Sequence, residues 1–120
     1  MNKKTLVLGA SNHPERYSFL AINRLKAAGH DVVGIGKYKG VVAGVEIETT
    51  PLPINDLHTV TLYLNPTHQK NYYDYILSLN PQRIIFNPGA ENDELAKLAL
   101  KKNIQAIEAC TLVMLSTGQY

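Results

Sequence analysis

The sequence predicts an α/β fold in which helices cover both faces of one doubly wound, mainly parallel sheet. Three observations lead to this prediction. Short apolar runs recur along the chain, helical patterns lie between most of them, and most runs lack the polar alternation of a half-exposed strand. The 120 residues leave room for one hydrophobic core, so we expect a single domain over residues 1–120.

Five apolar runs rich in Val, Ile and Leu are the predicted strands. They are Thr5–Gly9, Asp31–Ile35, Thr59–Leu64, Arg83–Phe86 and Gln105–Ile107. Strands covered on both faces have this composition, as in a parallel sheet. Between Lys37 and Asp56, glycines and prolines predict a loop with one short extended piece at Val45–Ile47.

Helical spacing of apolar residues predicts the layers around this sheet. The stripes are Phe19, Ile22 and Leu25; then Tyr72, Tyr75, Ile76 and Leu79; then Leu95, Leu98 and Ala99; a short helix is expected at Leu112–Leu115. Alternation of strand and helix is typical of a three-layer, Rossmann-like sheet of about five parallel strands.

Local signals predict where these helices begin and end. Gly29 and Asn103 follow helical segments and suit the left-handed conformation that ends a helix. Thr67 and Asn92 precede or open helical segments and are predicted as N-caps.

Composition excludes several classes of protein. The net charge of +2 is too small to predict nucleic-acid binding, and the apolar runs are too short to cross a membrane. The single cysteine, Cys110, excludes an internal disulfide and suggests a reducing, cytoplasmic compartment. The four histidines lack metal-ligand spacing and no hydrolytic triad is recognisable. The sequence therefore favours a ligand-binding module over an enzyme, with no catalytic and no metal-binding residue.

The turn after the first strand is the first candidate site. Gly9, Ala10 and Ser11 form a small-residue turn before a helix, where backbone N–H groups and the helix N-terminus can bind an anion. Ser18 adds a hydroxyl and Arg16 a planar cation suited to phosphate. The alternative is a plain tight turn with a solvated arginine.

The end of the second strand carries Gly36 and Lys37, with Lys39 nearby. A dinucleotide site for NAD normally has an acidic residue there, which contacts the ribose hydroxyls. Ammonium groups suit a phosphorylated ribose instead, so CoA and NADP remain candidates. The alternative is two surface lysines on a mobile glycine loop.

The third and fourth strands end at the same edge of the predicted sheet. The third strand ends in Leu64, Asn65 and Pro66. Gly89 follows the fourth strand, where it allows a positive φ or the close approach of a ligand. The alternative for both segments is an ordinary turn. Cys110 precedes the last predicted helix, where a thiol can be reactive or simply fill a buried space.

In these residues the chain resembles the small stand-alone CoA-binding proteins, which are similar to the N-terminal CoA-binding domain of the succinyl-CoA synthetase alpha subunit. The resemblance spans nearly the whole chain. It rests on Gly9-Ala10-Ser11, Pro14-Glu15-Arg16, Ala28-Gly29-His30, Gly44, Gly89-Ala90-Glu91-Asn92-Asp93-Glu94 and Cys110.

The resemblance implies that coenzyme A or an acyl-CoA lies across the carboxyl edge of the sheet. It assigns the phosphates to Gly9, Ser11 and Arg16, the adenine end to Gly36, Lys37 and Lys39, and the pantetheine path to Leu64, Asn65, Pro66 and Gly89. The synthetase's phosphorylated histidine belongs to another domain, so ligase activity is not implied. The chain departs from the family at Gly34-Ile35-Gly36-Lys37, where a Pro-Val-Asn-Pro run is usual, and at Ala109, where an arginine is usual.

Three functions are therefore open at this point. The first is a CoA or acyl-CoA binding protein whose partner is a small nucleotide ligand, with no nucleic acid and no membrane. The second is an NADP-binding, oxidoreductase-like domain that uses the same lysines. The third is a redox or interaction module that uses Cys110.

Overall fold

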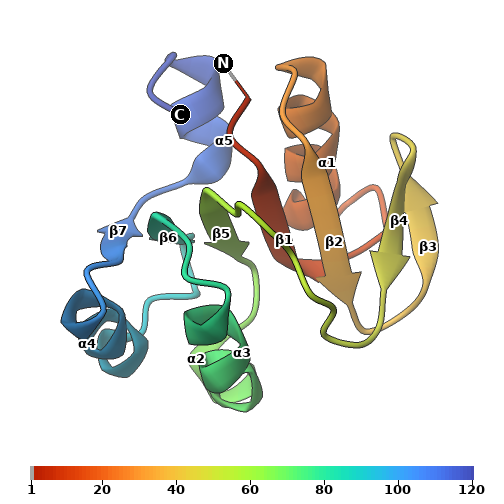
Figure 1. Cartoon of the computed structure of the whole chain (residues 1–120). Coiled ribbons are helices and arrows are strands. Elements are labelled where there is room, and N and C mark those ends of the chain that lie inside the picture. The colour runs from red at the N-terminus through yellow and green to blue at the C-terminus, as the bar shows by residue number, and fades with distance from the viewer. Residues whose placement is uncertain (1) are drawn as a thin grey trace.

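Strand β1 (Thr5–Ala10) lies in the middle of the molecule because nearly all of its side chains are apolar and buried. In the computed structural model, which describes residues 2–120, seven strands form one sheet (Figure 1). The other elements are α1 (Tyr17–Ala27), β2 (Val32–Gly36), β3 (Gly40–Val42), β4 (Val45–Glu48), β5 (Thr59–Leu62), α2 (Pro66–Gln69), a 3₁₀ turn η1 (Lys70–Tyr72), α3 (Tyr73–Ser78), β6 (Arg83–Phe86), α4 (Asp93–Lys101), β7 (Gln105–Glu108) and α5 (Thr111–Ser116). Met1, the first residue of the predicted domain, lies outside the described residues.

The strand order explains where a ligand can bind. The sheet runs β3-β4-β2-β1-β5-β6-β7, and every neighbouring pair is parallel except β3 with β4. Strands β2, β4 and β3 lie on one side of β1, and strands β5, β6 and β7 lie on the other side. The order therefore reverses between β1 and β5, and their carboxyl ends diverge to leave a crevice.

The predicted fold class is confirmed, with seven strands in place of about five. The two additional strands, β3 and β4, form an antiparallel hairpin within the segment that the sequence predicted as loop with one extended piece. Ala43 and Gly44, with φ of 51° and 80°, form its two-residue turn. The hairpin has no Asn-Gly or Asp-Gly signal, and β3 is only three residues long, so its sequence signature is weak.

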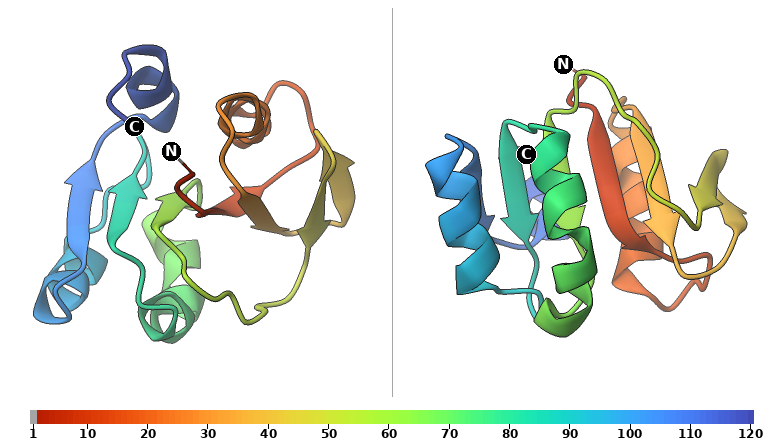
Figure 2. Two further views of the ribbon diagram at one scale, coloured as in Figure 1. Left: turned by 45° about the horizontal axis from the view of Figure 1, so that its top comes forward. Right: turned by 60° about the horizontal axis from the view of Figure 1, so that its bottom comes forward.

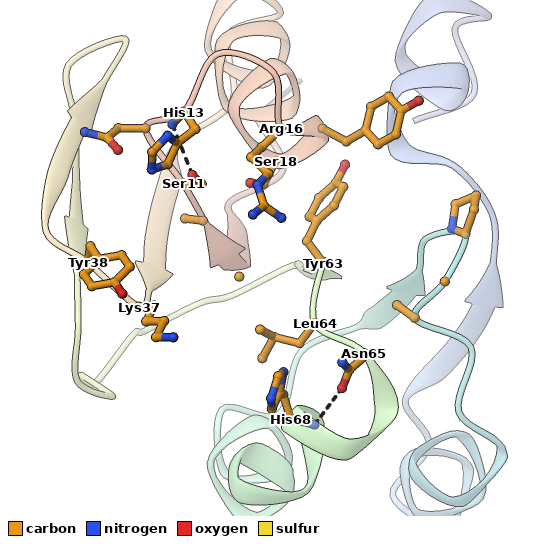
Figure 3. Close-up of a pocket in the computed structure, with 17 residues that line it drawn as sticks. Ser11, His13, Arg16, Ser18, Lys37, Tyr38, Tyr63, Leu64, Asn65 and His68 are labelled. Atoms are coloured by element: carbon orange, nitrogen blue, oxygen red, sulfur yellow. Dashed lines mark hydrogen bonds between the residues drawn. The ribbon is translucent and has the colours of Figure 1, made fainter.

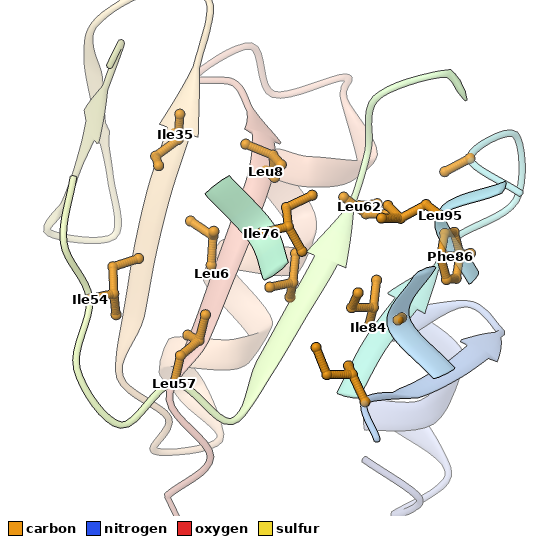
Figure 4. Packing of buried hydrophobic residues seen from close by; sticks show 14 residues of the cluster. Leu6, Leu8, Ile35, Ile54, Leu57, Leu62, Ile76, Ile84, Phe86 and Leu95 are labelled. Carbon is orange, nitrogen blue, oxygen red and sulfur yellow. The ribbon is translucent and has the colours of Figure 1, made fainter. Parts of the chain in front are cut away.

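The helices form the two outer layers (Figure 2): α1 and α5 cover one face of the sheet, and α2, α3 and α4 cover the other. Successive residues of β1 point to opposite faces. Leu6 and Leu8 join the core under α3 and α4 with Ile76 and Leu95 (Figure 4). Val7 joins the core under α1.

The predicted helical stripes pack against the sheet except at Leu98, which is half-buried and belongs to neither core. Ile22 and Leu25 are buried on the α1 side of the sheet, and Ile76, Leu95 and Ala99 are buried on the other side. The residues of the Tyr72 stripe are divided between η1, α3 and the residue after α3, but all of them pack against this second core.

Most of the predicted helix ends are also found. Gly29 and Asn103 have positive φ values of 89° and 61°. The Asn92 side chain accepts a hydrogen bond from the Leu95 N–H at 3.2 Å and caps α4. The prediction for Thr67 was wrong: the cap of α2 is Asn65, whose Oδ1 accepts from the His68 N–H at 3.0 Å. Pro66 occupies the first helical position, so the capping residue must precede it.

Basic residues gather at the amino ends of the parallel strands, on the opposite side of the sheet from the crevice at their carboxyl ends. Arg83 is buried, donates from Nε to Thr59 Oγ1 at 2.8 Å, and lies over the Tyr120 ring at 4.4 Å. His30 Nδ1 accepts the Lys3 backbone N–H at 2.9 Å, which requires that nitrogen to be unprotonated. Burial lowers the pKa of His30, and nearby positive charges, including those of Lys3 and Arg83, lower it further.

We expect this cluster to make the fold sensitive to acid. The pKa of His58 is also lowered, first by burial and then by Arg83 and Lys3. Both imidazoles therefore take up a proton more readily in the unfolded chain, whose histidine pKa is about 6.5. Their contribution to stability is complete above that pH and is lost as the pH falls through 6.5 toward the lower folded values. Urea unfolding at pH 7.5 and 5.5 should show a smaller free energy of unfolding at pH 5.5.

A double variant, His30→Gln with His58→Gln, provides the control for this pH effect. It should lose less stability between pH 7.5 and 5.5 than the wild type. An equal loss in both proteins would contradict the assignment to these two histidines.

Candidate functional site

A pocket of about 600 Å³ lies at the carboxyl ends of β1 and β5, where the strand order reverses (Figure 3). Four loops form it: those after β1, β2, β5 and β6. The predicted site residues that line it are Gly9, Ala10, Ser11, Arg16, Ser18, Lys37, Leu64, Asn65 and Gly89. The structure therefore brings together residues from all four segments that the sequence singled out.

Gly9 allows the loop after β1 to lie against the segment after β5. Its φ is 96°, a conformation that side chains rarely adopt. A Cβ atom at this position would lie 3.0 Å from the Tyr63 carbonyl carbon and 3.2 Å from Leu64. The glycine is thus required both for its backbone conformation and for the space it leaves.

The N-terminus of α1 opens into this pocket. Arg16 occupies the N-cap position without a capping side-chain hydrogen bond, and the first turn contains no acidic residue. Tyr17 and Ser18, from that first turn, line the pocket. Ser11 Oγ accepts the His13 N–H at 3.1 Å, which leaves the hydroxyl proton of Ser11 free to donate. Backbone amides and a positive helix end therefore face the cavity.

The charge of the pocket is positive. Arg16 and Lys37 line it with His13 and His68, whereas none of the lining residues is acidic. Over residues 2–120, the one ion pair joins His13 Nδ1 to Glu15 Oε1 at 3.6 Å. Arg16 and Lys37 therefore face the cavity without a carboxylate partner, an arrangement that suits a ligand with several negative charges.

Three predicted site residues lie outside the pocket lining. Gly36 is buried, and a Cβ atom there would lie 2.0 Å from the Ala10 carbonyl oxygen, so this glycine makes space for β1. Lys39 borders a smaller hollow of about 340 Å³ beside the hairpin. Pro66 is exposed at the start of α2.

Other residues of the lining were not predicted as site residues, among them Tyr17, Tyr38, Tyr63 and His68. Tyr63 was assigned to a strand, but β5 ends at Leu62, and Tyr63 and Leu64 leave the sheet to line the pocket. The Tyr63 hydroxyl is buried without a hydrogen-bond partner among residues 2–120. Burial raises the pKa of Tyr63 to about 12, so the phenol is protonated at neutral pH.

Asn87, next to the pocket-lining residue Pro88, joins several elements by hydrogen bonds. It is buried at the end of β6, and its Nδ2 donates to Thr61 Oγ1 at 2.7 Å and to the Leu62 carbonyl at 2.8 Å. Its Oδ1 accepts the Thr111 N–H at 2.9 Å. One amide therefore joins β5, β6 and the start of α5. Cys110 lies next to this contact, half-buried and outside the pocket lining.

Two further features are absent from residues 2–120. No group of three or more His, Cys, Asp or Glu residues there could hold a metal ion. No helix in the same range is long and apolar enough to span a membrane.

Comparison with known proteins gives one family and several similar structures. A family model described as "CoA binding domain" matches residues 3–116. A crystal structure of a protein described as uncharacterized is 48% identical, with a TM-score of 0.97 over 100% of this chain and 99% of that one. No curated protein matches the chain.

More distant structures share the fold. A hypothetical protein from Pyrococcus horikoshii OT3 is 24% identical, with a TM-score of 0.86 over 97% of this chain and 83% of that one. A protein from Thermus thermophilus, cell-free ID.343, is 18% identical, with a TM-score of 0.84 over 98% of this chain and 91% of that one.

Proposed function

Because the chain belongs to the CoA-binding domain family, we propose that it binds coenzyme A or an acyl-CoA in the pocket at the carboxyl ends of β1 and β5. The observation that carries this proposal is the pair of unpaired cations, Arg16 and Lys37, beside the uncapped N-terminus of α1. Coenzyme A carries a diphosphate and a 3′-phosphate, so its charge complements this lining.

The proposed placement follows the four loops. The diphosphate lies against Gly9, Ser11 and Arg16, where amides and the helix end point into the cavity. The phosphorylated ribose lies near Lys37, and pantetheine runs past Leu64 toward Gly89. Lys39, outside the lining, contributes only to the longer-range positive potential.

We propose a binding module without chemistry of its own. Burial raises the pKa of Tyr63, so this lining phenol is more weakly acidic than usual, and its hydroxyl is buried. An NADP-binding domain would use Lys37 and Lys39 as well, but the family match concerns CoA. The free, half-buried Cys110 is compatible with a reducing, cytoplasmic compartment. The proposed partner is a small nucleotide ligand, with no nucleic acid and no membrane.

Isothermal titration with coenzyme A tests the proposal. Arg16→Ala should raise the dissociation constant at least about tenfold, because hydrogen bonds to charged groups contribute about 1.5–3 kcal/mol. Dephospho-CoA should bind more weakly than CoA to the wild type, and Lys37→Ala should remove most of that difference. Arg24→Ala, in the last turn of α1, is the matched control and should leave the affinity unchanged.

Two results would count against the assignment. The first is the absence of binding at millimolar CoA. The second is tighter binding of NADPH than of CoA, which would favour the oxidoreductase-like alternative.

A further inference from the structure

Gln69 is a polar side chain that is buried completely between two of the loops around the pocket. It is the last residue of α2. Its Nε2 donates to the carbonyl oxygens of Leu64 and Ala90, both at 2.8 Å. Its Oε1 accepts from Asn92 Nδ2 at 2.9 Å. Both amide protons and the amide oxygen therefore have partners.

The two carbonyls belong to different walls of the pocket. Leu64 lies in the loop after β5 and Ala90 in the loop after β6, and both residues line the cavity. The ladder between these strands ends at the pair Leu62 and Phe86, so the loops have left the sheet where Gln69 joins them. One side chain thus links two walls that the strands no longer hold together.

Gln69 is itself held from the side away from the pocket. Asn92, which donates to the Gln69 amide oxygen and caps α4, also donates to the Tyr73 hydroxyl at 2.8 Å. Tyr73 in turn donates to Glu94 Oε1 at 2.9 Å. Since α3 and α4 fix this network, the amide group of Gln69 has one defined position.

We propose that Gln69 is a positioning residue that sets the separation of the two pocket walls and so prepares them for the pantetheine end of the ligand. The inference rests on the proposed function, because that function places pantetheine between Leu64 and Gly89. A ligand that meets walls already fixed in place does not have to order them on binding. Without the amide donors, the carbonyls of Leu64 and Ala90 are unpaired, and the loops part to reach water.

Two ligands separate this role from a general effect on the fold. Gln69→Met keeps the size of the side chain and removes both donors. Affinities are measured at a temperature at which thermal unfolding curves show every variant to be fully folded. A variant that is only less stable then keeps its ligand affinity. CoA should bind at least tenfold more weakly than to the wild type. Adenosine 3′,5′-bisphosphate, which lacks pantetheine, should bind within twofold of the wild type. Gln82→Met, at an exposed glutamine, should change neither affinity.

The remaining outcomes are distinct. Unchanged CoA affinity in Gln69→Met overturns the role of Gln69 and leaves the proposed function in place. An equal loss for both ligands also overturns it, because it indicates a general disturbance. Absence of CoA binding by the wild type overturns the proposed function and, with it, this inference.

Hydrogen exchange of the wild type gives a second test that requires no variant to fold. Bound CoA should slow exchange in residues 64–69 and 88–92 together, because one side chain joins these segments. Protection of only one segment contradicts the proposal.

Discussion

Gly36→Ala is expected to lower the free energy of unfolding by about 3 kcal/mol, the upper end of the usual cost of overpacking a core. The added Cβ would lie 2.0 Å from the Ala10 carbonyl oxygen and 3.2 Å from Ile47 Cγ2. A backbone oxygen cannot rotate away, so β1 and β2 must separate at the floor of the pocket. Urea unfolding followed by circular dichroism measures the loss.

Gly34→Ala is the matched control, on the same strand two residues earlier. There the nearest atom to an added Cβ is Ala10 Cβ at 3.3 Å, a contact that small shifts relieve. The change in stability should stay within about 1 kcal/mol. Similar unfolding free energies for the two variants would contradict the packing role of Gly36.

Asn87→Ala should have a comparable effect for a different reason. The substitution leaves the Leu62 carbonyl and the Thr111 N–H without their buried partners. Each unsatisfied buried group costs about 1–3 kcal/mol, so we expect a loss of about 3 kcal/mol. Thr61 suffers less, because its hydroxyl keeps Thr111 Oγ1 at 2.8 Å.

Asn71→Ala, at an exposed asparagine in η1, is the control for Asn87→Ala and should stay within about 0.5 kcal/mol of the wild type. Asn87→Asp adds a second comparison. It keeps an acceptor for the Thr111 N–H but directs a carboxylate oxygen toward the Leu62 carbonyl. If both variants at position 87 unfold like the wild type, the buried amide does not join these elements in the way the geometry indicates.

The main sheet could be predicted because its strands are apolar on both faces. The runs at Thr5, Arg83 and Gln105 begin at the same residues as β1, β6 and β7. The hairpin could not be predicted with the same certainty, because β4 gains its burial by pairing with β2, which its own short apolar pattern does not reveal. The exit of the chain from β5 after Leu62 likewise depends on the packing of Tyr63, which the apolar run does not reveal.

The candidate site was predictable in outline from one topological rule. Loops at the carboxyl ends of parallel strands meet at one edge, so residues such as Ser11, Lys37 and Leu64 could be grouped from the sequence alone. Gly36 shows the limit of that rule. A glycine at a strand end can face a ligand or admit a neighbouring backbone, and the two are distinguished here because an added Cβ would lie only 2.0 Å from the Ala10 carbonyl oxygen. The role of Gln69 could not be predicted from the sequence, because it depends on hydrogen bonds to two carbonyls, of Leu64 and Ala90, in separate loops.

The hairpin also affects how this sheet ends. Its outermost strand, β3, is three residues long and lies antiparallel to β4, next to the exposed cation Lys39. A second copy adding a strand there would find few backbone groups to pair, with the charged Lys39 directly before the edge. Short edges flanked by charge disfavour edge-to-edge growth into aggregates. The segment with the weakest sequence signature therefore helps to keep the folded chain from polymerising.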